Sequence, residues 1–153
     1  MPSSDEQANE ALTYLRERFG VEELPGRVVE RGDALWLTTA SGELPEGIPT
    51  IAMGVRLLRR HGRGLKPTSF GLMLLGDRIR AQRVNLSRSE LEALLQGRTL
   101  TRKDLPPGYV ALCFEGEVLG CGHVKGGLLR CQIPRGRRQE LLTALSAARR
   151  GGV

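Results

Sequence analysis

The chain has 153 residues, of which 40% are hydrophobic and only 4% aromatic, so it can form a core but has few rings for base stacking. Its formal net charge is +6 and its pI is about 9.9, a balance that favours a polyanionic partner. No apolar run approaches the roughly 18 residues of a membrane span, and the polar start MPSSDEQANE lacks the pattern of a secretory signal. We therefore expect a cytoplasmic protein without membrane association.

The first third of the chain predicts a helix followed by a hairpin. Apolar residues recur at three- and four-residue steps over 5–19, and Ser3 with Glu6 has the spacing of a capping box. Residues 27–31 and 34–39 predict two strands joined by a turn at Gly32-Asp33. A loop rich in glycine and proline then covers 40–50.

The middle of the chain predicts four short elements. Alternation over 51–59 indicates a strand, and His61-Gly62-Arg63-Gly64 indicates a flexible basic loop. Residues 67–75 predict a short helix with Pro67 in its first turn and Gly76 as its end. A strand is expected over 81–85.

From residue 87 onward the pattern changes to one helix and several short strands. Ser87 and Glu90 form a second capping box, which opens a helix that ends at Gly97. Strands are predicted over 109–115, 118–125 and 128–133, with Gly126-Gly127 as a tight turn and a terminal helix over 137–149. Tyr109 is expected to pack inside the resulting barrel. We predict an α+β unit over 1–86, followed by a small β-barrel with a C-terminal helix over 87–153.

The positive charge is concentrated in two stretches. Residues 1–24 hold six acids and two bases, whereas 56–83 hold eight bases and one acid, and 125–150 hold seven bases and one acid. Two such segments favour nucleic acid. The alternative is a solvated basic surface, since 20 of the 23 bases are arginine, a bias that a GC-rich genome also produces.

The sequence offers little for catalysis or metal binding. The three cysteines, Cys113, Cys121 and Cys131, are spaced without a CxxC pair, which predicts buried thiols in strands and no zinc site. The chain has two histidines and no phosphate-binding loop, nucleophile elbow or metalloprotease motif, and His123 has no evident catalytic partners. We expect no enzymatic activity, no metal and no other cofactor.

Several segments together resemble a known family. They are Gly54–Leu58 with Lys66–Phe70, Asn85–Glu90 with Leu94–Gly97, Gly108–Leu112 with Leu119–Gly122, and Gly127–Arg130 with Ile133–Arg137. Their order and spacing are similar to the C-terminal, PUA-like RNA-binding region of ribosomal-RNA cytosine-C5 methyltransferases of the Sun (Fmu) group. They also resemble small ribosome-assembly factors built from a pre-PUA unit and a PUA domain. The resemblance implies a pre-PUA-like unit, a PUA-like barrel and RNA binding without the methyltransferase domain, for which so short a chain has no room.

We predict two groups of RNA-contacting side chains. The first group follows the second barrel hairpin, where Gly136 is expected to let the chain turn sharply; it comprises Lys125, Arg130, Arg135, Arg137 and Arg138. The second surrounds the glycine loop of the first unit and comprises Arg59, Arg60, Arg63 and Lys66. Arginine forks suit phosphate oxygens, so recognition by RNA shape and backbone is expected. We expect both groups to lie on one surface; the alternatives are a solvated barrel rim and an ordinary exposed loop.

The predicted function is therefore binding of structured ribosomal RNA during ribosome biogenesis or ribosomal-RNA modification. One alternative is a protein–protein adaptor, in which the acidic helix docks a ribosomal protein or a separate methyltransferase. The other is an RNA-modifying enzyme with a pocket lined by His123 and acids. A flat basic face distinguishes RNA binding from that enzyme.

Overall fold

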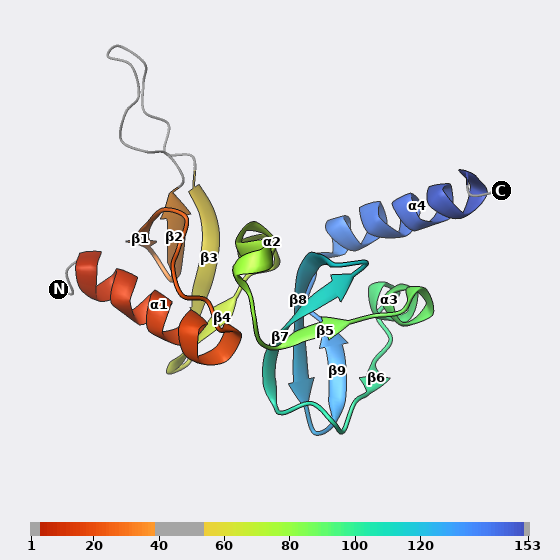
Figure 1. Cartoon of the computed structure of the whole chain (residues 1–153), viewed down its shortest axis with the longest axis horizontal. Coiled ribbons are helices and arrows are strands. Elements are labelled where there is room, and N and C mark those ends of the chain that lie inside the picture. The colour runs from red at the N-terminus through yellow and green to blue at the C-terminus, as the bar shows by residue number, and fades with distance from the viewer. Residues whose placement is uncertain (1–3, 39–53, 152–153) are drawn as a thin grey trace, which may run out of the picture. The chain divides into compact units, whose positions relative to one another are not determined.

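The computed structural model describes residues 4–38 and 54–151, and the chain divides into two compact units, Met1–Gln82 and Arg83–Val153. We call these the N-terminal unit and the C-terminal unit. Each contains one sheet and its own helices, so the predicted α+β class is confirmed (Figure 1). The boundary between the two units lies after Gln82. The change of sequence pattern had placed this boundary near residue 86.

The N-terminal unit is a four-stranded antiparallel sheet with two helices. The strands lie in the order β1-β2-β3-β4. Their bounds are β1 Arg27–Arg31, β2 Ala34–Thr38, β3 Gly54–His61 and β4 Gly64–Pro67. Helix α1, Ser4–Phe19, precedes β1. The predicted first helix and hairpin are confirmed, while the Ser3 capping box and residues 39 and 51–53 of the predicted strands lie outside the described residues.

One face of this sheet packs against α1. The inward residues of the helix, Ala11, Leu15 and Phe19, are fully buried, and so are Leu35 and Leu37 of β2. The helix residues recur every four positions and the strand residues every two, which are the apolar patterns visible in the sequence. Burial of these two stripes against each other fixes the helix on one face of the sheet and leaves the other face for different contacts.

The segment after β3 differs from its prediction in two places. The predicted loop His61–Gly64 is a tight turn of a β3–β4 hairpin, with Gly62 at φ 58°, and β4 was not predicted because four residues carry too little periodicity. Helix α2 spans Ser69–Leu75, and Pro67 belongs to β4. The helix begins later because the hydroxyl of Thr68 accepts a hydrogen bond from the amide of Gly71 at 2.9 Å. The end at Gly76 is confirmed, and a 3₁₀ turn, Gly76–Arg78, follows.

The C-terminal unit is a curled five-stranded sheet in the order β5-β7-β8-β9-β6. Its strands are β5 Arg83–Asn85, β6 Leu100–Thr101, β7 Gly108–Phe114, β8 Glu117–Lys125 and β9 Leu128–Cys131. Its helices are α3 Arg88–Leu95 and α4 Arg135–Gly151. β5 pairs with β7 in parallel, and the other pairs are antiparallel. The two-residue strand β6 was not foreseen.

Local signals in this unit act as the sequence predicted. Ser87 accepts a hydrogen bond from the amide of Glu90, and the Glu90 carboxylate accepts one from the amide of Ser87 at 2.9 Å, so the capping box is confirmed. Gly126 and Gly127 have φ values of 59° and 74°, which a two-residue hairpin turn requires at both positions. The turn therefore fixes the register of β8 against β9.

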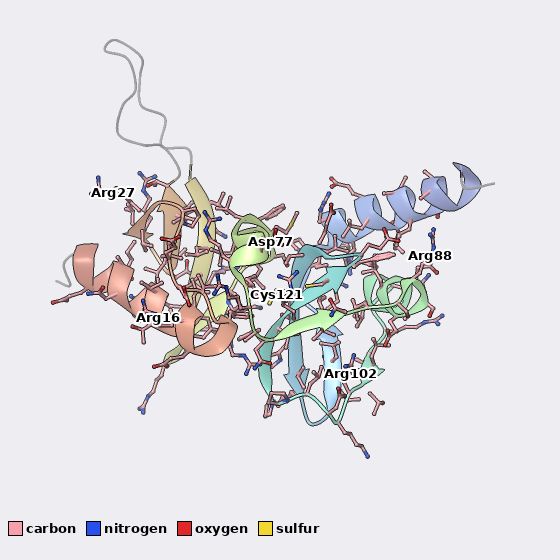
Figure 2. All side chains as sticks on the ribbon, in the orientation of Figure 1. Arg16, Arg27, Asp77, Arg88, Arg102 and Cys121 are labelled. Atoms are coloured by element: carbon pink, nitrogen blue, oxygen red, sulfur yellow. The ribbon has the colours of Figure 1, made fainter. Side chains whose placement is uncertain are left out.

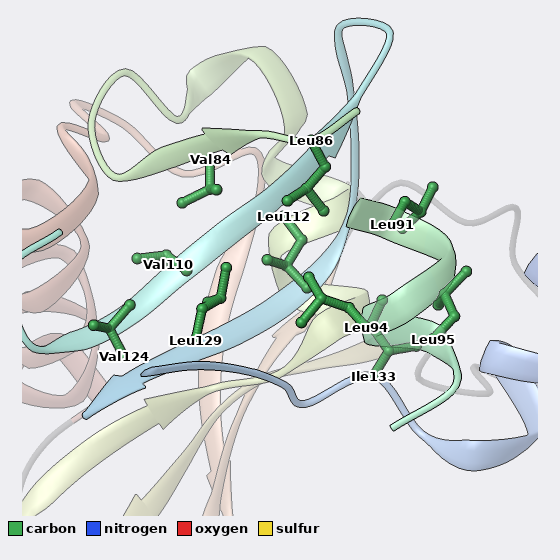
Figure 3. Packing of buried hydrophobic residues seen from close by; sticks show 10 residues of the cluster. All are labelled: Val84, Leu86, Leu91, Leu94, Leu95, Val110, Leu112, Val124, Leu129 and Ile133. Carbon is green, nitrogen blue, oxygen red and sulfur yellow. The ribbon is translucent and has the colours of Figure 1, made fainter. Parts of the chain in front are cut away.

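The core of the C-terminal unit lies between the curled sheet and α3 (Figure 3). Leu91, Leu94 and Leu95 of α3 pack toward Val110 and Leu112 of β7, and all five are buried. Residues of α4 complete the cluster from outside with three partly buried leucines, Leu141, Leu142 and Leu145. This core holds the end of α3, the end of β9 and the start of α4 in a fixed arrangement.

The thiols of Cys113 and Cys121 are buried in β7 and β8, as predicted, whereas Cys131 in β9 is partly exposed; all three are free. Within the described residues, no group of three or more His, Cys, Asp or Glu side chains has a geometry that suits a metal ion. No described helix is both long enough and apolar enough to cross a membrane.

Candidate functional site

A basic pocket of about 300 Å³ opens in the C-terminal unit where α3, β9 and α4 meet. It is lined by Gly97, Arg98, Thr99, Arg130, Cys131, Gln132 and Arg138. Three of these seven residues are arginines and none is acidic. We call this site the basic pocket.

The backbone around the basic pocket sets the positions of its arginines. Gly97, at φ 89°, ends the turn after α3, and the amide of Arg98 donates to the carbonyl of Ala93 at 2.9 Å. At the opposite side, Nε of Arg138 donates to the carbonyl of Ile133 at 2.6 Å, which ties the side chain to the strand–helix junction. Arg130 is exposed on β9 between them.

The charge of the basic pocket suits an anion. Arg98 and Arg130 are exposed and Arg138 is half-buried, and all three line one concave surface that is accessible to solvent. Clefts lined by one sign of charge focus the field and concentrate ions of the opposite sign. The planar guanidinium fork matches the two oxygens of a phosphate or carboxylate. The arrangement therefore has the charge and the donor geometry that a phosphate group requires.

The first turn of α4 adds positive charge beside the basic pocket. It carries Arg135, Arg137 and Arg138 and no acidic residue. The dipole of a helix favours anions at this end, so three cations here are unfavourable by about 0.3–1 kcal/mol each. Arg137 is partly compensated by Glu140, whose carboxylate lies 3.0 Å from its Nη1. A bound anion would relieve the remaining repulsion, because helix N-termini accept phosphates readily.

A row of side chains crosses the sheet from β7 to the basic pocket. The register pairs Tyr109 with His123 and His123 with Arg130, so the three lie on one face. The rings of Tyr109 and His123 stack at a centroid distance of 4.5 Å. Tyr109 is half-buried and lies on the face of β7 opposite Val110, so it is not part of the core cluster between the sheet and α3 where we expected it to pack.

Lys125 is exposed at the end of β8 and shares a sheet face with His123 and Arg130, since two residues separate it from His123 along the strand. It stands at the Gly126-Gly127 turn, whereas the basic pocket lies at the other end of β9. Lys103 also lies at this turn, where its side chain packs over Gly127. Lys125 thus extends the positive face of Arg130 along the hairpin, and Lys103 adds a second lysine near the turn.

The second predicted group lies in the N-terminal unit, where carboxylates engage Arg59 and Arg60. Nη2 of Arg59 lies 3.6 Å from Asp33. Arg60 forms a bidentate pair with Glu10 of α1, at 2.9 Å for both contacts, and a third bond to Glu30 of β1 at 2.6 Å. The Arg60 guanidinium lowers the pKa of Glu10 through these hydrogen bonds. Arg60 therefore joins α1 to the sheet and is not an open phosphate ligand.

The remaining members of the second group are Arg63, exposed in the β3–β4 turn, and Lys66, which pairs with Arg59 across β3 and β4. They belong to the N-terminal unit, whereas the first group belongs to the C-terminal unit. A single surface formed by both groups stays a prediction.

Of the residues predicted from the sequence, Arg130 and Arg138 line the basic pocket, whereas Arg98 in the pocket and Lys103 at the hairpin turn were not predicted. Arg98 directly follows Gly97, the predicted end of a helix, which is a signal for a side chain placed at a helix terminus. Nothing in the sequence indicated that this terminus meets β9. The expected sharp turn at Gly136 is wrong, because this glycine lies within the first turn of α4.

Comparison with known proteins finds a match that covers most of the C-terminal unit. Residues 81–139 match a family model described as the Methyltransferase RsmF PUA domain. The matched range runs from β5 into α4 and includes every residue that lines the basic pocket. The predicted resemblance to the PUA-like region of ribosomal-RNA methyltransferases and the predicted PUA-like barrel are thereby confirmed.

Two relatives align with both units. The chain is 28% identical over 148 residues to Ribosomal RNA small subunit methyltransferase F of Shewanella loihica, an alignment that covers 94% of this chain and 30% of that protein. It is 25% identical over 143 residues to the protein of the same name from Psychromonas ingrahamii, which covers 84% of this chain and 28% of the relative. The chain thus spans less than a third of the length of either methyltransferase.

Proposed function

We propose that this chain binds RNA through the basic pocket and the first turn of α4. The observation that carries the proposal is the meeting of Arg98, Arg130 and Arg138 around a pocket that no acidic residue lines. Three arginines so placed hold successive phosphates of a folded backbone and carry no base code of their own. Lys125 and Arg135 extend the contact along the hairpin and the helix start.

The proposed RNA is structured ribosomal RNA, and the proposed role is in ribosomal-RNA modification or ribosome biogenesis. Support comes from the similarity of residues 81–139 to a PUA domain and from the names of the two relatives, both methyltransferases of small-subunit ribosomal RNA. In this proposal the chain supplies RNA binding and takes no part in methyl transfer. A methyltransferase and ribosomal proteins are its proposed protein partners, and the cytoplasm its proposed location.

The structure gives less support to the two alternatives. An adaptor role assigned the acidic helix α1 to a basic partner, but its Glu10 is held by Arg60 and its apolar face is buried in the N-terminal unit. An enzyme role required His123 among acids in a pocket, but the ring of His123 stacks on Tyr109. Neither feature favours the alternative that the sequence left open.

The test is binding of a fluorescently labelled hairpin from small-subunit ribosomal RNA, measured by anisotropy with the full chain. The double variant Arg98→Gln, Arg130→Gln should bind about tenfold more weakly or worse, since two charge-assisted contacts are lost. Its log–log salt slope should also be shallower, by about 0.7 for each lost phosphate contact in single-stranded segments. Arg138 is left intact because its bond to Ile133 supports the fold.

The matched control is Arg16→Gln, which removes one exposed positive charge from α1 in the other unit. This variant should bind within about twofold of the unchanged protein, as expected for a surface charge outside the interface. Equal affinity of the double variant and the unchanged protein at low salt would reject the basic pocket as the RNA site.

A further inference from the structure

The outward face of the N-terminal sheet is built differently from the face that packs on α1. Register places Val28 opposite Leu37 on the buried face, and it places Val29 opposite Trp36 and Trp36 opposite Arg56 on the other. A register shift between Leu35 and Trp36 makes Leu57 an extra residue in β3, so Leu57 and Leu58 are both buried. The outward face therefore continues from Arg56 to Arg59.

This outward face is strongly basic. Strand alternation and register assign to it Arg27, Arg31, Arg56, Arg59 and Lys66. Arg27, Arg31, Arg56 and Arg59 are exposed, and Figure 2 shows Arg27 on the N-terminal sheet. Of the described strand residues that register assigns to this face, none is acidic; Asp33, in the β1–β2 turn, lies 3.6 Å from Arg59.

An indole ring lies in the middle of these cations. Trp36 is the only tryptophan of the chain and is partly exposed on the central strand β2. Its ring lies near Gly54 of β3, where a Cβ would come within 3.4 Å of Cε3. The guanidinium carbon of Arg56 stands 5.1 Å from the ring centroid, and Val29 beside it is 36% exposed. Ring, guanidinium and valine form one platform surrounded by arginines.

We propose that this outward face binds single-stranded RNA, with a base stacked on the Trp36–Arg56 platform and the flanking phosphates held by Arg27, Arg31 and Arg59. Proteins that bind unpaired strands combine aromatic side chains, or arginine planes, with a positive groove along the backbone. In a duplex the base faces are stacked on one another, so a duplex offers no free base face to the Trp36 indole. The positive charge of the outward face disfavours a basic partner. A polyanion without bases would bind the arginines but would make no use of the exposed Trp36 ring.

This inference is independent of the basic pocket, because the two sites belong to different units. It also contradicts the expectation that stacking contributes little, which rested on the low aromatic content. One ring suffices where register places it among cations.

Trp36 makes the test direct, since the fluorescence of the full chain comes from this one indole. Titration with the oligoribonucleotide rA10 should quench the emission saturably, because a base stacked on an indole quenches it. Quenching should be kept in the variant Arg98→Gln, Arg130→Gln. Inorganic polyphosphate of equal charge should leave the emission nearly unchanged, because it has no base to stack.

Affinity gives a second readout. Trp36→Leu should weaken rA10 binding by about tenfold, within the range known for base–aromatic stacking, and Trp36→Phe should restore most of it. Arg16→Gln, on the α1 side of the sheet, is the charge control and should bind as the unchanged protein does. Circular dichroism establishes that each variant is folded.

The proposal is overturned if rA10 saturates anisotropy without quenching, which would assign all binding elsewhere and leave the basic pocket as the RNA site. It is equally overturned if polyphosphate or poly-glutamate quenches as strongly as rA10, or if an RNA duplex binds this face as tightly as the single strand. Loss of binding only in the basic-pocket variant supports the proposed function and rejects this one.

Discussion

Arg60 is a residue whose role in the structure differs from the role that the sequence predicts. In the sequence it is one of eight bases in a positive stretch, and it is naturally grouped with Arg59 and Arg63. In the structure its guanidinium is paired with Glu10 of α1 and with Glu30 of β1. These carboxylates lie fifty and thirty residues away, so no local pattern identifies them. Its role is to fix the helix on the sheet.

Replacement of Arg60 by methionine should therefore destabilise the protein by about 1 kcal/mol, because two ion pairs that share one guanidinium are lost. Arg59→Met should cost less, since its pair with Asp33 is longer, at 3.6 Å, and exposed. Urea unfolding of both variants checks this, and equal losses would mean that the Glu10–Arg60–Glu30 cluster contributes no more than a surface pair.

The same cluster predicts a pH dependence. Arg60 holds the pKa of Glu10 below its ordinary value, so the pair contributes stability above the ordinary carboxyl pKa. This contribution should disappear as the pH falls through the lowered pKa of the folded state. Because Glu10 is 44% exposed, the effect should stay below about 1 kcal/mol. Thermal midpoints between pH 7 and pH 3 should fall less in Glu10→Gln than in the unchanged protein; parallel curves would contradict the assignment.

At the scale of elements, turn and cap chemistry was readable and element pairing was not. The Gly126-Gly127 turn and the Ser87–Glu90 capping box are local, and both stand where the sequence indicates. Strands β4 and β6 are too short for periodicity, and their places in the sheets come from hydrogen bonds to β3 and β9. The basic pocket was only half predictable for this reason, since Arg98 reaches it through the packing of α3 beside β9.

At the start of α4, a substitution that raises stability should lower the proposed RNA binding. Arg135→Glu places an acid where the helix dipole favours one, so stability should rise by about 0.3–1 kcal/mol. If Arg135 contacts a phosphate as proposed, the same change should weaken RNA binding, because a positive charge becomes a repelling negative one. Thermal melting and anisotropy on one preparation check both signs. A variant that is less stable and binds equally well would contradict the role of this turn.

Two helical glycines should respond oppositely to alanine. A Cβ at Gly71 would approach the carbonyl oxygen of Leu57 to 2.7 Å, so Gly71→Ala should separate α2 from β3 and destabilise by about 1–3 kcal/mol. Gly136, in α4, has nothing within 4 Å of the same position, and Gly136→Ala should stabilise by about 0.5–1 kcal/mol. Chemical denaturation separates the two, and stabilisation by Gly71→Ala would refute the close packing of α2 on β3.

At the scale of the whole chain, two positive surfaces on two units predict a dependence on RNA length. If the outward face and the basic pocket bind the same molecule, affinity should rise steeply once the RNA reaches both, because the second contact is intramolecular. A series from 6 to about 40 nucleotides measures this, with the double variant Arg98→Gln, Arg130→Gln as reference. In that variant the steep rise should vanish. A smooth rise in both proteins would mean that each unit binds RNA separately.

Strand β5 determines where the C-terminal unit can be cut from the rest of the chain without exposing a sheet edge. This strand begins at Arg83, the first residue of the C-terminal unit, and pairs with the edge of β7. Four residues of β7 are fully buried: Val110, Ala111, Leu112 and Cys113. A shorter polypeptide starting at residue 87, where the sequence pattern changes, would expose that apolar edge and invite self-association through it. One starting at residue 83 keeps the edge paired. We therefore expect the four residues 83–86, which are strand β5 and Leu86, to decide whether the excised unit is a monomer or an aggregate.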